Sequence, residues 1–67
     1  MKRWRAKWKF RKEDHARNGR NGTETVEATD RNTAGAIVKT RVSKSLTGMN
    51  TEAVQSCVEI TSIKEIT

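Results

Sequence analysis

The most regular feature of the chain is a strict alternation of basic and apolar residues across positions 3–11. Every odd position holds Arg or Lys, and every even position holds Trp, Ala or Phe. Successive side chains of a β-strand point to opposite sides, so this alternation is typical of a strand with one buried face. On a helix no single apolar face would form, because Trp4 and Ala6 would lie on nearly opposite sides. The pattern therefore predicts a strand at 3–11 with an apolar face and a cationic face.

A chain reversal and a second strand are expected next. The triplet Arg-Asn-Gly occurs twice within 12–22, and Asn-Gly pairs accept the positive backbone angles of a hairpin turn. We therefore predict a hairpin loop at 12–22, with the turn at either pair. The following strand should span 23–29, with Val26 and Ala28 toward the core. Glu27 would then share the cationic face of the first strand and neutralise part of it.

The middle of the chain predicts one amphipathic helix at 31–46. Asp30 is a favourable N-cap, and Gly48 is a natural C-terminal stop. Apolar residues recur at helical spacings of three and four: Ala34, Ile37, Val38, Val42 and Leu46.

The last third of the chain predicts a loop and a third strand. Residues 47–56 are expected to be a loop, although 50–54 also fits the start of a short helical turn. From 57 to 66 the chain is rich in β-branched residues, which favour a strand. Val58 and Ile60 should lie on one side of this strand. Ile63 and Ile66 then break the alternation. This break predicts either a bulge or a strand end covered by a partner subunit.

Together these elements predict one α+β domain over 1–67, in the order strand, strand, helix, strand. A right-handed crossover through the helix makes the third strand parallel to the second. The first strand is best placed at the centre of the three-stranded sheet, because its bulky Trp4, Trp8 and Phe10 side chains would then lie under the helix. Its cationic face would be flanked by Glu27 on one side and Glu59 on the other.

Size and composition limit the possible classes of protein. A chain of 67 residues with 33% hydrophobic residues builds a thin core, so self-association as a homodimer is one way to stabilise it. The single cysteine cannot form an internal disulfide. The longest apolar run has three residues, which is too short for a membrane span or a secretory signal. We therefore expect a cytoplasmic protein.

Charge is concentrated at the start of the chain. The first twenty residues carry nine basic and two acidic residues, whereas the remaining 47 carry five basic and six acidic ones. Such segregation indicates an acidic partner, most often nucleic acid. An anionic membrane is a poorer match, because the apolar face of the first strand is needed by the core. We therefore expect no membrane binding.

Catalysis and metal binding have little support in the sequence. His15 and Cys57 are the only residues of their kinds, and neither has a third partner that would make a catalytic or metal-binding set. No glycine-rich loop joins a strand to a helix, so nucleotide binding is not indicated. We expect a protein that is not an enzyme and needs no cofactor or metal.

The candidate binding residues form what we call the basic row, with two further cations from the hairpin loop. The basic row is Arg3, Arg5, Lys7, Lys9 and Arg11, and the loop cations are Arg17 and Arg20. Because Trp4 and Trp8 lie on the opposite face, contacts should go to phosphates rather than stack on bases. The expected partner is the phosphate backbone of a nucleic acid or an acidic surface of a nucleoprotein complex. Alternatives are a solvated sheet face, a protein-binding inhibitor without nucleic-acid contact, and a structural or oligomer-forming module.

The predicted layout also resembles a group of known proteins. Two strands, a crossover introduced by Val26-Glu27-Ala28-Thr29-Asp30 with Ala34 at the start of the helix, and a closing strand resemble small phage-encoded proteins that disable host machinery. Among these are an inhibitor of host RNA polymerase and some anti-CRISPR proteins, which block the surveillance complex. The resemblance implies an inhibitor that acts in the host cytoplasm. This chain departs from the polymerase inhibitor, whose binding strand is negatively charged.

Overall fold

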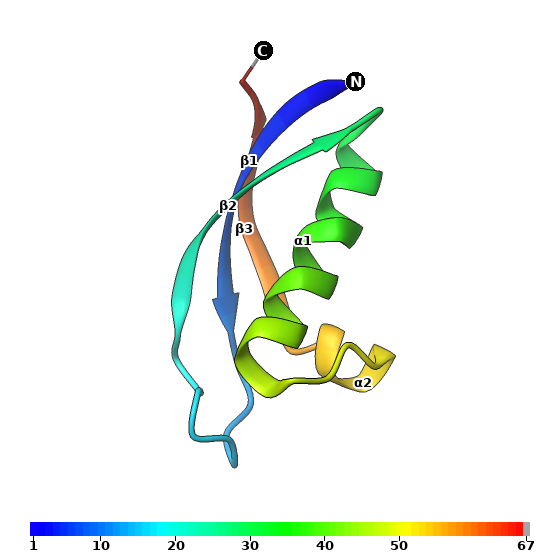
Figure 1. The fold of residues 1–67 in the computed structure, drawn as a ribbon. Coiled ribbons are helices and arrows are strands. Elements are labelled where there is room, and N and C mark those ends of the chain that lie inside the picture. Colours follow the sequence, from blue (N-terminus) through cyan, green and yellow to red (C-terminus); the bar gives the residue numbers. More distant parts are fainter. Residues whose placement is uncertain (67) are drawn as a thin grey trace.

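A computed structural model of the protein describes residues 1–66 as a three-stranded sheet with one main helix packed on it. The elements are β1 (Lys2–Phe10), β2 (Asn21–Ala28), α1 (Arg31–Thr47), α2 (Glu52–Gln55) and β3 (Val58–Glu65). The sheet order is β2-β1-β3, and both outer strands run antiparallel to β1. Both helices lie on the same side of the sheet, and the two termini lie at the same end of the molecule (Figure 1). The predicted α+β fold with a central first strand is confirmed.

The alternation along β1 separates core from surface. Trp4, Ala6 and Phe10 are buried, and the Trp4 indole Nε1 donates a hydrogen bond to the Ala28 carbonyl oxygen at 3.1 Å. The other buried apolar residues come from every remaining element and are Val26, Ala28, Ala34, Val38, Val42, Val54 and Val58. These side chains are small, so the two large aromatic rings of β1 supply much of the apolar area that leaves water.

Trp8 is less buried than the alternation predicts. Its side chain packs against the core but stays half-exposed. The ring lies over Gly22 of β2, where a Cβ atom would come within 2.8 Å of the Trp8 Cζ2 atom. The absence of a side chain at Gly22 therefore leaves room for this ring. Trp8 covers the start of β2 instead of lying fully under α1.

The helix α1 begins and ends where its capping residues predict. Asp30 is the N-cap, and its Oδ1 atom accepts a hydrogen bond from the Thr33 amide at 2.7 Å. Gly48 closes the helix in the left-handed region, with φ at 77°, and its amide donates to the Lys44 carbonyl. The buried side of α1 carries Ala34, Val38, Val42 and Ser43.

The connections differ from the sequence predictions in two places. The region 47–56 is not only a loop, because α2 forms one helical turn whose Val54 is buried in the core. The first reversal is a loop at 11–20, and β2 already begins at Asn21, two residues before the predicted strand. Of the two Asn-Gly pairs, only the first supplies a left-handed residue, Gly19, with φ at 85°.

A bulge in β3 explains the broken alternation near the C-terminus. The register pairs Lys7 with Ser62 but Trp8 with Ile60, so Thr61 is an extra residue in β3. Its hydroxyl donates to the Lys7 carbonyl at 3.2 Å. The extra residue turns Ile63 to the helix side of the sheet, where it packs against the core opposite Ala6. The bulge that the sequence offered as one of two explanations is therefore present.

Candidate cationic interface

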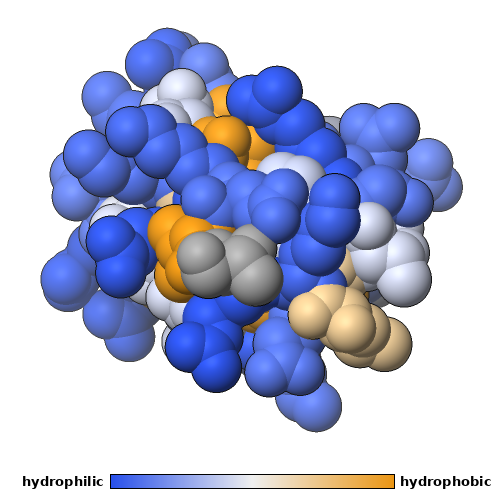
Figure 2. Space-filling model, turned by 90° about the horizontal axis from the view of Figure 1, so that it is seen from above, coloured by the Kyte–Doolittle hydropathy of each residue, from blue (hydrophilic) through white to orange (hydrophobic). Residues whose placement is uncertain are grey.

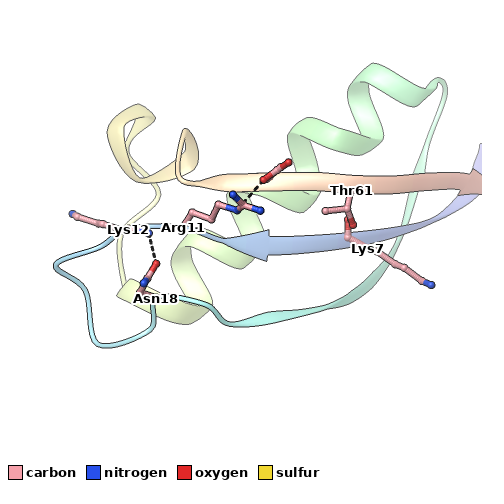
Figure 3. A network of polar contacts seen from close by, with 6 residues as sticks. Lys7, Arg11, Lys12, Asn18 and Thr61 are labelled. Atoms are coloured by element: carbon pink, nitrogen blue, oxygen red, sulfur yellow. Dashed lines mark hydrogen bonds and ion pairs between the residues drawn. The ribbon is translucent and has the colours of Figure 1, made fainter.

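The side of the sheet away from α1, which we call the open face, is covered by no other element of residues 1–66 (Figure 1). β1 runs through its middle and presents Arg3, Arg5, Lys7 and Lys9 there. The first three side chains are exposed and Lys9 is half-buried. The Lys7 side chain extends into solvent (Figure 3). Four of the five residues in the basic row thus stand in line on an uncovered surface.

Acidic groups on the open face lie toward its two ends. Glu27 of β2 is opposite Arg3, and Glu59 of β3 is opposite Lys9. The Glu59 carboxylate is paired with Arg11, the last residue of the basic row, because its Oε2 atom lies 3.1 Å from Arg11 Nε. Figure 3 shows this ion pair as the dashed line at Arg11. Between these ends, the residues opposite the basic row on β2 are Thr25 and Thr23. The positive charge of the row is therefore least compensated at its centre.

One cation on the open face was missed in the sequence analysis. Lys64 of β3 lies directly opposite Arg5 and is exposed. Strict alternation from Val58 would have put Lys64 on the core side, and the bulge at Thr61 moves it to the open face. The irregular spacing of Ile63 was the signal in the sequence that could have revealed this.

Three of the predicted candidates, namely Arg11 of the basic row and the two loop cations, do not stand in the line formed by the other four. Arg11 lies just beyond the end of β1 and is engaged by Glu59. Arg17 is exposed in the loop at 11–20, where its amide donates to His15 Nδ1 at 3.0 Å. Arg20 is exposed just before β2, where its carbonyl oxygen accepts a hydrogen bond of 2.7 Å from the Phe10 amide, so it lies past the end of the row. A hydrogen bond of 2.9 Å from the Lys12 amide to Asn18 Oδ1 helps to hold this loop (Figure 3).

The single histidine and the single cysteine, which could in principle act in catalysis or metal binding, each contact neighbouring residues. The His15 ring packs edge-on against Phe10, with ring centroids 5.3 Å apart. The Cys57 thiol is free and lies 3.5 Å from the Ala53 carbonyl oxygen. Within residues 1–66, no group of three or more His, Cys, Asp or Glu side chains could hold a metal ion. In the same part of the chain, neither helix is both long and apolar enough to cross a membrane.

The end of the molecule that carries both termini is largely hydrophilic, with small apolar areas between the polar side chains (Figure 2). Lys2 forms an ion pair at this end, since its Nζ atom lies 3.6 Å from the Glu65 Oε1 atom. The neighbouring Ile66 amide donates to the Arg3 carbonyl oxygen and extends the sheet past the end of β3.

Comparisons with protein-family models, with curated proteins and with solved structures found no match for this chain.

Proposed function

We propose that this protein is a small non-enzymatic binding protein whose open face engages nucleic acid, alone or in a nucleic-acid-handling complex, through phosphates. The observation that carries the proposal is the uncovered line of cations at the centre of the sheet. Four come from β1 and one from β3. Phosphate backbones present a regular array of negative charge, which a fixed line of cations complements.

The position of the row in the sheet weakens the main structural explanation for it. Lysine and arginine often protect the edges of sheets against pairing with other chains. In this protein four of the five cations lie on β1, which is hydrogen-bonded on both sides and has no free edge, and only Lys64 lies on an edge strand. Edge protection would place them on β2 or β3 instead.

The aromatic residues argue against recognition of bases by stacking. Proteins that stack on bases place aromatic rings in the same groove as the cations. Here Trp4 is only 9% exposed, and its indole donates a hydrogen bond to the Ala28 carbonyl oxygen on the helix side of the sheet. Contacts from the open face would therefore go to the backbone and depend little on sequence.

The salt dependence of duplex binding tests the proposal. Each neutralised phosphate of B-DNA contributes about −0.9 to the slope of log affinity against log salt. If Arg3, Arg5, Lys7, Lys9 and Lys64 all make contacts, the slope should be about −4.5. Fluorescence anisotropy with a labelled mixed-sequence duplex, at about 0.05 to 0.2 M NaCl, measures it. A slope near zero would overturn direct binding to a duplex.

A pair of variants with equal net charge locates the contact surface. Lys7→Glu reverses a charge at the centre of the open face, and Lys44→Glu reverses the charge of an exposed side chain on α1. Lys7→Glu should weaken binding much more strongly than Lys44→Glu. Equal losses in the two variants would mean that net charge, and not the open face, determines binding.

A protein-binding inhibitor is the competing class, and it is the activity implied by the resemblance to phage-encoded inhibitors. Affinity capture from a bacterial lysate, with and without nuclease, separates the two classes. Partners that engage through nucleic acid should be lost after nuclease treatment. A partner that is retained after nuclease, together with a flat salt dependence for the purified protein, would replace the present proposal.

A further inference from the structure

We infer that Lys64 and Ser62 of β3 complete, with Arg5 and Lys7 of β1, a subsite for a single phosphodiester group. This inference rests on the proposed function and names the place where the nucleic-acid backbone is bound most tightly. It also adds two residues of β3 that the pattern of β1 alone does not indicate.

The register brings the four residues together. Arg5 is directly opposite Lys64, and Lys7 is directly opposite Ser62. Directly opposed residues in an antiparallel pair have Cβ atoms roughly 5 Å apart, and diagonal neighbours lie roughly 7 to 8 Å apart. The three cationic side chains are long enough to reach one group held between the two strands.

The surface between these side chains is hollowed. A hollow of about 230 Å³ is lined by Arg5, Lys7, Ser62, Lys64 and Ile66. A single water needs roughly 10 to 15 Å³ of such space, so the hollow has room for a phosphate group with part of its hydration shell. Ile66 gives this hollow one apolar wall beside the charged ones.

The charges around the hollow are uncompensated within the described chain. Arg5, Lys7 and Lys64 take part in neither of the ion pairs found in residues 1–66. Like charges directly opposite one another destabilise a sheet, so the Arg5–Lys64 pair works against folding. Such an arrangement is typical of a site whose charge is balanced only when an anion is bound.

The donor set fits a phosphodiester in particular. The Arg5 guanidinium offers paired N–H donors, while the two lysines act as compact charges that adjust to the oxygen positions. The Ser62 hydroxyl can rotate to donate a further hydrogen bond. A tetrahedral phosphodiester accepts donors from several directions at once, whereas a planar carboxylate accepts them mainly in one plane.

The first test removes one charge from this site and the same charge from the opposite side of the molecule. Lys64→Gln is compared with Lys44→Gln in binding to the labelled duplex. Loss of one phosphate contact should reduce the salt slope by about 0.9, which corresponds to roughly eightfold weaker binding at 0.1 M salt. Lys44→Gln should retain the wild-type slope. Equal slopes in wild type and Lys64→Gln would overturn the subsite while leaving duplex binding by the open face intact.

The second test uses a small probe, so that failure of the subsite and failure of the proposed function are distinguishable. Dimethyl phosphate, a monoanionic phosphodiester, is titrated into the labelled protein and backbone amide shifts are followed by NMR. The amides of Ser62 and Lys64 should respond, and acetate at the same concentration should move them much less. Equal responses to acetate would overturn the phosphodiester assignment. A response to the phosphodiester without any duplex binding would support the subsite and overturn the proposed function.

A stability measurement keeps the inference testable if a variant binds weakly for other reasons. Lys64→Glu puts a carboxylate opposite Arg5, which replaces a repulsive cross-strand pair by an attractive one. The thermal midpoint of the free protein should rise by up to about 5 °C, while duplex affinity falls. A lower midpoint would contradict the uncompensated charge on which the inference depends.

Discussion

At the scale of single residues, Ser43 conflicts with its surroundings. Its side chain is fully buried on α1, and its hydroxyl oxygen has no hydrogen-bond partner within residues 1–66. A buried hydroxyl that has lost water without gaining a partner costs free energy, and serine is also a weaker helix former than alanine. Ser43 is therefore a position where the sequence works against the stability of the fold.

We expect Ser43→Ala to raise the free energy of unfolding by about 1 kcal/mol or more, because it removes this unpaired group and improves helix propensity. Ser45→Ala is the matched control, since Ser45 is exposed on the same helix and tests propensity alone. Urea denaturation of both variants measures the difference. A loss of stability in Ser43→Ala would show that the hydroxyl has a partner, such as a buried water.

At the scale of elements, the N-terminus of α1 gives the fold a defined response to acid. The Asp30 pKa is lowered below the ordinary value of 3.8, chiefly because its carboxylate accepts a hydrogen bond from the Thr33 backbone amide. A group with a lowered pKa in the folded state stabilises the fold above its ordinary pKa. That contribution disappears as the pH falls through the lowered value.

We therefore expect acidification below about pH 4 to lower the thermal midpoint of the wild type more than it lowers the midpoint of Asp30→Asn. The amide of asparagine also caps a helix but does not titrate, so it lacks this contribution at every pH. The other carboxylates are common to both proteins and cancel in the comparison. Parallel curves for the two proteins between pH 2 and 7 would contradict the role of the Asp30 charge.

The elements also show which parts of the fold could be predicted from local sequence patterns. β1 and α1 were predictable to within one residue at each end, because alternation and capping are local properties. The bulge in β3 depends on pairing with Lys7, which is far away in the chain, so the alternation offered a bulge as one explanation but did not show that Lys64 lies on the open face. The short helix α2 is stabilised by burial of Val54 in the core, which its polar neighbours do not reveal.

At the scale of the whole molecule, charge and core are separated by the sheet. The apolar side packs against both helices, while the other side holds the line of cations (Figure 1). The alternation predicted the two faces of β1, and its bulky aromatic side chains predicted its central position in the sheet. Arg11, the last residue of the predicted row, lies beyond the end of β1. The sequence also placed Glu59 beside the row, whereas the contribution of Lys64 and Ser62 of β3 became visible only in the folded chain.

This separation should make the free protein more stable as salt is added. Neighbouring cations of the row lie roughly 6.6 Å apart on one face of the strand, and the protein carries a formal net charge of +6. The Debye length falls from roughly 30 Å at 0.01 M to roughly 8 Å at 0.15 M, so added NaCl screens this repulsion. We expect the thermal midpoint to rise over that range, unlike that of a fold held by surface ion pairs.

The origin of that rise can be assigned with the charge-matched variants described above. Lys7→Glu interrupts the row and should flatten the dependence of the midpoint on NaCl, whereas Lys44→Glu should change it much less. Chloride is compared with sulfate at equal ionic strength, because sulfate also stabilises proteins through its exclusion from their surface. Equal flattening in both variants would assign the repulsion to net charge instead of to the row. A midpoint independent of NaCl in the wild type would mean that the row is already balanced, and would remove the electrostatic basis for an anionic partner.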